Sequence, residues 1–246
     1  MSGSQSLKIK IFADGADLAS MKAMYANPVV KGFTTNPTLM KAAGIDDYVN
    51  FAHKVLTAIP DRPVSFEVFA DEFDQMERQA LEIASWGRNV NVKIPVTNTK
   101  AVFAGPLISR LAKRGVVLNI TAVFTLEQVR RVAEALSSDV PAIVSVFAGR
   151  IADSGIDPMP LMREAAQLLG TSRPKAELLW ASSRELLNVI QAEEVGCGII
   201  TVTNDIIKKL ALIGKDQTAY SLETVKMFYN DASAAGFTIA TRAAAE

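Results

Sequence analysis

One lysine and two carboxylates stand inside apolar runs that read as buried strands, and these are the residue types of nucleophilic and acid–base catalysis. They are Lys93 in VNVKIPV, Glu67 in VSFEV and Asp14 in KIFAD. A partly dehydrated interior disfavours the charged form of an amine, so Lys93 can attack a carbonyl carbon. Carboxylates within its reach can take up and return protons. The three residues predict covalent catalysis assisted by proton transfer.

Further polar side chains fall near the carboxyl ends of other predicted strands. Asn36 ends GFTTN, Asn119 and Thr121 lie in VLNITAV, and Ser145 lies in IVSVF. Residues two apart on a strand face the same way, so Asn119 shares a face with Thr121, and Ser145 with Phe147. A polar side chain in a buried strand costs free energy unless it is paired or used. These groups therefore indicate one polar site.

Two arginines follow late strands and can hold an anion. Arg150 lies in VFAGRIAD, and Arg184 follows Ser182 in WASSRE. A guanidinium group matches the geometry of a phosphate, and loops after late strands commonly form the anion site of a barrel. The alternative interpretation is that both are surface arginines in the first turns of helices.

The central lysine also has a non-catalytic interpretation. Lys93 could pair with Glu67 or Asp14 and simply fill the interior, because structural ion pairs are common in such places. The convergence of two acids, one lysine and several hydroxyl and amide groups favours a catalytic site.

Eight short apolar runs alternate with helical segments along the 246 residues, which is typical of parallel strands joined by crossover helices. With eight such units and no linker, we predict an α/β fold, a single (β/α)8 or TIM barrel, over residues 1–246. An open doubly wound sheet is the structural alternative. The predicted strands are Leu7–Asp14, Gly32–Asn36, Val64–Phe69, Asn89–Val96, Val116–Val123, Ala142–Ala148, Ala176–Ser182 and Gly198–Thr203.

An additional C-terminal helix is predicted over residues 221–235, with Ser221 as its N-cap. We expect it to pack against the barrel or a neighbouring subunit. Its apolar positions are in helical register: Leu222, Val225, Phe228 and Tyr229.

Composition excludes several functional classes. Lys plus Arg and Asp plus Glu number 26 each, so no global charge favours nucleic acid or an anionic membrane. No run of about 18 apolar residues occurs, and the start MSGSQSLKIKIF lacks the pattern of a secretory signal. We therefore expect a cytoplasmic protein without membrane or nucleic-acid partners.

Metal and nucleotide chemistry are also disfavoured. With one histidine, His53, which reads as a helix-surface residue, a three-His zinc site is impossible. The one cysteine, Cys197, reads as a buried packing residue. Neither GxGxxG after the first strand nor GxxxxGK[ST] occurs, so we predict no metal and no cofactor.

Six motifs occur in the order and spacing of a known family: FADGAD, GFTTNPT, NVKIP, LNITAVFT, VFAGRIAD and WASSR. From about Ile11 to Thr203 the chain resembles the transaldolase family, including its short fructose 6-phosphate aldolase branch. The resemblance implies that Lys93 forms a Schiff base and that Asp14 takes the proton from the substrate C4 hydroxyl. It implies that Glu67 and Thr121 position the catalytic water and move protons.

The resemblance also implies the substrate contacts. Asn36, Asn119 and Ser145 match positions that hold the hydroxyls of a dihydroxyacetone unit, and Thr34 and Phe147 are further expected substrate-binding residues. Arg150, Ser182 and Arg184 match the phosphate site. Where the aldolase branch typically has glutamine and tyrosine, this chain has Glu67 and Phe147, as transaldolases do.

The expected function is therefore transfer of a dihydroxyacetone unit from a ketose phosphate to an aldose phosphate by a homo-oligomer. Alternatives are a dihydroxyacetone-dependent aldolase, a transaldolase for a modified anionic sugar such as a sulfosugar, and a non-catalytic sugar-phosphate-binding barrel. The FADGAD opening and the SSRE segment depart from the commonest family pattern, which leaves the terminal anion open.

Overall fold

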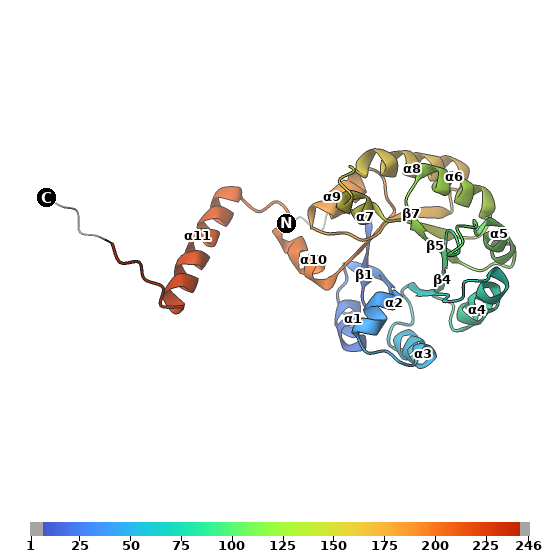
Figure 1. Cartoon of the computed structure of the whole chain (residues 1–246), viewed down its shortest axis with the longest axis horizontal. Coiled ribbons are helices and arrows are strands. Elements are labelled where there is room, and N and C mark those ends of the chain that lie inside the picture. Colours follow the sequence, from blue (N-terminus) through green and yellow to red (C-terminus); the bar gives the residue numbers. More distant parts are fainter. Residues whose placement is uncertain (1–6, 242–246) are drawn as a thin grey trace.

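A computed structural model describes residues 7–241. Within this range eight parallel strands close into a barrel in sequence order, and helices surround it (Figure 1). The strands are β1 (Lys10–Asp14), β2 (Val30–Thr34), β3 (Val64–Glu67), β4 (Val90–Pro95), β5 (Leu118–Val123), β6 (Ala142–Val146), β7 (Ala176–Trp180) and β8 (Ile199–Val202). Pairing of β1 with β8 closes the sheet, so the predicted TIM barrel is confirmed and the open-sheet alternative is wrong.

Helices lie between successive strands and cover the outside of the barrel (Figure 1). They are α1 (Leu18–Tyr25), α2 (Pro37–Ala42), α3 (Tyr48–Ala58), α4 (Phe73–Ser85), α5 (Gly105–Lys113), α6 (Leu126–Ala135), α7 (Ala148–Asp153), α8 (Met159–Ser172) and α9 (Leu187–Glu194). After the last strand follow α10 (Asn204–Lys209), the 3-10 turn η2 (Leu210–Leu212) and α11 (Gln217–Ala234). Helix α6 begins with a capping box in which Thr125 and Gln128 satisfy each other's main-chain N–H groups.

The ends of the predicted strands differ from the observed ends for local reasons. Strand β2 begins two residues earlier than predicted and ends at Thr34. Asn36, predicted as its last residue, is instead the N-cap of α2, and Pro37 opens that helix. The two ends of the predicted 1–246 domain, with the first half of the MSGSQSLKIKIF segment, lie outside the described residues.

The apolar interior has two parts. Side chains such as Val92 and Ile94 are fully buried between the sheet and the helices. A smaller cluster fills the inside of the barrel and includes Phe12, Ile143 and Leu179. Gly32 makes room for it, because a Cβ there would lie 2.5 Å from the Phe12 ring. This inner cluster closes the barrel beneath its carboxyl-terminal mouth.

Cys197 and His53 lie where the sequence predicts, one in the packed interior and one on a helix surface. Cys197 is buried, and burial raises the pKa of its thiol to about 12. His53 is exposed on α3, where its ring lies near that of Trp86. Neither lines the cavity at the mouth of the barrel.

Helix α11 differs from the prediction in its start and its packing. It begins at Gln217, and Asp216 caps it by accepting from the N–H of Ala219 at 2.8 Å, so Ser221 lies inside the helix. The helix projects away from the barrel (Figure 1), and residues 217–234 contain no buried side chain. The expectation that it packs on its own barrel is therefore wrong; packing on a neighbouring subunit stays a prediction.

Across residues 7–241, none of the helices combines the length and the apolar character needed to cross a membrane.

Candidate active site

A cavity of about 480 Å³ opens at the carboxyl-terminal mouth of the barrel. All twelve predicted site residues line it, although they come from strands and loops spread over most of the chain. Parallel strands bring their carboxyl ends to one face, so the fold gathers these side chains. Both pairs of residues predicted to share a strand face, Asn119 with Thr121 and Ser145 with Phe147, line this cavity.

Lys93 lies at the centre of the polar contacts. Its Nζ is 2.9 Å from Oε2 of Glu67, its register partner across the β3–β4 pair. It also donates a hydrogen bond to the carbonyl of Thr35 at 2.9 Å. The two charged side chains are 9% and 17% exposed. The ion pair of the non-catalytic interpretation is thus present, but it lines an open cavity instead of filling the barrel.

Asp14 is the second carboxylate of the site. Thr34 Oγ1 donates a hydrogen bond to its Oδ1 at 2.8 Å. Burial raises the pKa of Asp14 above its ordinary value of 3.8, although the Thr34 hydrogen bond and the charge of Lys93 act in the opposite direction. A carboxylate whose pKa is raised is a better proton acceptor than one in water.

The mouth of the barrel also contains a connected hydrogen-bond network. Ser145 Oγ donates to Asn119 Oδ1 at 2.6 Å, and Asn119 Nδ2 donates to Ser65 Oγ at 3.1 Å. Two residues beyond Asn119 on the same face lies Thr121. The next residue, Ala122, has φ of +58°, and the pairing of β5 with β6 shifts there. The bulge marks a place where β5 departs from regular geometry beside the cavity.

Asn36 reaches the cavity from the start of α2. Its Oδ1 accepts from the N–H of Leu39 at 3.0 Å, which caps the helix. Its amide NH₂ group therefore supplies any donor that Asn36 offers to a substrate.

The two predicted anion-binding arginines differ in their surroundings. Arg184 is held by Asp153 of α7 through two hydrogen bonds, of which that from Nε measures 3.0 Å. This contact lowers the pKa of Asp153 and raises that of Arg184. Arg150 lies over the ring of Phe147, with Cζ 5.5 Å from the ring centroid. The guanidinium of Arg184 is therefore held in place by a carboxylate, and that of Arg150 by an aromatic ring.

Gly149 explains how the two arginine-bearing segments come together. A Cβ on this glycine would lie 1.6 Å from the carbonyl oxygen of Ser182, so only glycine fits there. Ser182 has φ of +60°, and the N–H of Gly149 donates to the carbonyl of Ala181 at 3.1 Å. The start of α7 and the end of β7 are thus in direct main-chain contact.

Four polar residues of the cavity were not predicted as site residues: Thr38, Ser183, Thr201 of β8 and Thr203 just after it. Thr201 Oγ1 is 2.5 Å from Thr34 Oγ1, and both Thr201 and Thr203 line the cavity. A threonine inside the apolar run GIITV was a usable signal. Threonine is also common in strands for its branched side chain, so its type alone did not distinguish it.

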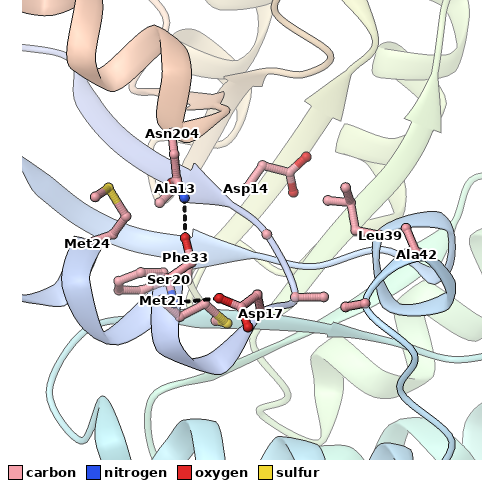
Figure 2. A pocket seen from close by; sticks show the side chains of 13 residues that line it. Ala13, Asp14, Asp17, Ser20, Met21, Met24, Phe33, Leu39, Ala42 and Asn204 are labelled. Carbon is pink, nitrogen blue, oxygen red and sulfur yellow. Dashed lines mark hydrogen bonds between the residues drawn. The ribbon is translucent and has the colours of Figure 1, made fainter.

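A second cavity of about 290 Å³ lies beside the end of β1, with residues of α1 and α2 and the first residue of α10 in its lining (Figure 2). Asn204 donates to Ser20 Oγ, and the N–H of Ser20 donates to Asp17 at 2.7 Å. In Figure 2 the carboxyl group of Asp14 points away from these three residues. Asp14 lines both cavities and forms part of the wall between them.

In residues 7–241, no three His, Cys, Asp or Glu side chains come close enough together to hold a metal ion.

Comparisons with known proteins agree with this arrangement. A family model described as transaldolase/fructose-6-phosphate aldolase matches residues 11–245. A probable transaldolase of Dehalococcoides mccartyi is 35% identical over 202 residues, which cover 82% of this chain and 90% of the relative. One from Methanococcus maripaludis is 36% identical over 204 residues, covering 82% and 89%. Probable transaldolase 2 of Listeria monocytogenes is 34% identical over 206 residues, covering 82% and 88%.

The family model covers nearly the whole barrel, and the relatives are matched over most of their own length, so the chain belongs to the transaldolase/fructose-6-phosphate aldolase family.

Proposed function

We propose that this protein is a transaldolase that transfers a dihydroxyacetone unit from a ketose phosphate, of the fructose 6-phosphate or sedoheptulose 7-phosphate type, to an aldose phosphate. The observation that carries the proposal is the 2.9 Å contact between the Lys93 amine and the Glu67 carboxylate in an open cavity shared with Asp14. At this distance a proton can move directly between the two groups while the amine attacks a carbonyl carbon.

The first half-reaction begins when Lys93 attacks the C2 carbonyl of the donor. The new C–N bond gives a carbinolamine, and Glu67 with Thr121 returns a proton to the C2 hydroxyl, which leaves as water. The protonated Schiff base then accepts the electron pair of the C3–C4 bond while Asp14 takes the C4 hydroxyl proton. An aldose phosphate leaves, and the three-carbon enamine stays on Lys93.

The second half-reaction reverses these steps with a new acceptor. The enamine carbon attacks the acceptor aldehyde, and Asp14 returns its proton to the oxygen that was the aldehyde. Water then hydrolyses the Schiff base and frees Lys93. Thr34, Asn36, Asn119 and Ser145 are proposed to hold the hydroxyls of the dihydroxyacetone unit, while Arg150, Ser182 and Arg184 hold the terminal anion beside Phe147.

Borohydride trapping tests the Schiff base. Fructose 6-phosphate plus borohydride is expected to add a reduced three-carbon or six-carbon unit to Lys93, detected by peptide mass spectrometry. Lys93→Met is the negative control. An unlabelled Lys93 in a folded enzyme would favour a sugar-phosphate-binding barrel instead.

The acceptor distinguishes a transferase from an aldolase. With erythrose 4-phosphate present, a transaldolase produces sedoheptulose 7-phosphate, whereas an aldolase releases free dihydroxyacetone. Running the same assay with a ketose that carries a sulfonate in place of the phosphate identifies the preferred anion. If kcat/KM is higher for the sulfonate ketose than for the phosphate ketose, the sulfonate ketose becomes the proposed donor.

We also propose that the enzyme works in the cytoplasm as a homo-oligomer in which α11 lies on a neighbouring copy of the chain. Four apolar side chains recur on this helix and are 54–72% exposed: Leu222, Val225, Phe228 and Tyr229. Apolar patches of this kind on a helix without contacts to its own barrel usually mark a subunit interface.

Light scattering tests this assembly. The full chain is expected to have a multiple of the 26.5 kDa subunit mass, and Phe228→Glu is expected to shift it toward a single subunit. Lys226→Glu, a charge change on the same helix, serves as the matched control. A monomeric full chain would refute the proposal.

A further inference from the structure

Tyr48, at the start of α3, contacts both main-chain groups of Glu67. Its hydroxyl accepts a hydrogen bond from the Glu67 N–H at 2.8 Å and donates one to the Glu67 carbonyl at 3.1 Å. Its ring lies against three aromatic rings, with centroids 4.6–6.1 Å away: Phe66, Phe69 and Trp86. Burial raises the pKa of Tyr48, which keeps its hydroxyl protonated and able to donate.

These contacts occur where the β2–β3 ladder stops. The last register pair is Thr34 with Ser65. In a parallel ladder, one further step would direct the N–H of Glu67 to the carbonyl of Thr35, and the carbonyl of Glu67 to the N–H of residue 37. Residue 37 is proline, which has no N–H, so the ladder cannot continue in full.

The Thr35 carbonyl has another partner instead. It accepts the 2.9 Å hydrogen bond from Lys93 Nζ. Without Tyr48, the N–H of Glu67 and the Lys93 amine would both be drawn to this one oxygen. With Tyr48, the N–H is already satisfied and the carbonyl is left to the amine.

We propose that Tyr48 is a positioning residue of this enzyme: its hydroxyl ends the β2–β3 ladder, reserves the Thr35 carbonyl for Lys93 and fixes the Glu67 carboxylate against the amine. This inference rests on the proposed function, because the roles of Lys93 and Glu67 come from it. Tyr48 does not line the cavity and acts only through its neighbours.

Tyr48→Phe tests the inference, because it removes the hydroxyl and keeps the ring. We expect kcat with fructose 6-phosphate and erythrose 4-phosphate to fall by about 10- to 100-fold, the loss caused by misplacement of reacting groups on the order of 1 Å. KM is expected to change little, since the substrate-binding residues are untouched. Tyr25→Phe is the matched control, because it also removes a hydroxyl hydrogen bond, that to Asp61, and neither of these residues lines a cavity described above.

A second measurement does not depend on turnover. Reductive methylation of the unliganded enzyme, followed by peptide mass spectrometry, reports the reactivity of Lys93 itself. Tyr48→Phe is expected to change the methylation rate of Lys93 relative to the surface lysines, whereas Tyr25→Phe leaves it unchanged. Circular dichroism verifies that both variants are folded.

The outcomes separate the two proposals. If the parent enzyme gives no adduct on Lys93, the proposed function fails, and the methylation rates still decide whether Tyr48 positions the amine. If the parent enzyme turns over and Tyr48→Phe matches it in both kcat and Lys93 methylation, the inference about Tyr48 is wrong. A KM increase with unchanged kcat would also overturn it.

Discussion

Substitution of Gly149 gives the sharpest test of how the proposed anion site is built. In Gly149→Ala the new Cβ would lie 1.6 Å from the Ser182 carbonyl oxygen, whereas real Cβ atoms essentially never approach closer than 3.0 Å. The two segments must therefore separate by at least about 1.4 Å, the difference between these distances. Because Arg150 follows Gly149 and Arg184 follows Ser182, the variant is expected to move the two arginines apart.

The expected effect is on substrates that carry a terminal anion. Displacement on the order of 1 Å can cost about 100-fold, so kcat/KM for fructose 6-phosphate is expected to fall by about that factor. Borohydride trapping of Lys93 with free dihydroxyacetone, which has no phosphate, is expected to continue at the parental rate. Coupled kinetics and peptide mass spectrometry provide the two measurements.

Gly170→Ala is the matched control. This glycine lies in α8, and a Cβ added to it would have no other atom within 4 Å, so alanine is expected to stabilise the helix by up to about 1 kcal/mol without changing kinetics. The reasoning is refuted if Gly149→Ala keeps parental kcat/KM for the phosphorylated sugar. It is also refuted if trapping with dihydroxyacetone falls as steeply, because the damage would then not be confined to the anion site.

Three further predictions concern single side chains. Because the pKa of Asp14 is raised, kcat should fall toward acid pH with a midpoint above 3.8, and Asp14→Asn should remove most activity. The same variant should raise Tm at neutral pH, where the ionised carboxylate costs stability, and lose this gain below 3.8, where Asp14 is protonated in both states. Arg184→Ala should raise KM for fructose 6-phosphate by about 10- to 100-fold, as expected for a lost charged hydrogen bond. Asp153→Asn should change it by less than about fivefold, because half-exposed ion pairs contribute about 1 kcal/mol or less. Iodoacetamide at about pH 8 should label Cys197 only after denaturation, because the buried thiol is protonated.

Much of the site could be predicted from the sequence because barrel strands make side-chain direction regular. Once Lys93 was placed in a strand buried on both sides, alternation directed Val92 and Ile94 toward the helices and the amine into the barrel. The same rule placed Asn119 with Thr121. These residues line one cavity, and predicting this did not require the loop conformations.

Other contacts could not be predicted because they join residues far apart through loops and helices. The bond from Arg184 to Asp153 spans 31 residues, and its geometry depends on how α7 meets the end of β7. Tyr48 contacts Glu67 from the first turn of α3, and the apolar pattern of that helix does not predict a hydrogen bond from its hydroxyl. Periodicity reports which face of an element is buried, not which atom a polar group on that face will meet.

The barrel closes where β8, the last strand, pairs with β1, the first, and this pairing affects when activity appears during folding. Asp14, the proposed proton acceptor, comes from β1, and its partner Thr34 contacts Thr201 of β8, so this set of contacts is complete only when the last strand joins the first. A ribosome-bound or truncated chain lacking β8 would keep the Lys93–Glu67 pair of β3 and β4 but lose the Thr201 contact behind the Thr34–Asp14 hydrogen bond. During refolding, recovery of carbon–carbon bond cleavage should therefore lag behind recovery of Lys93 reactivity. The delay between the two would measure how long β8 takes to pair with β1.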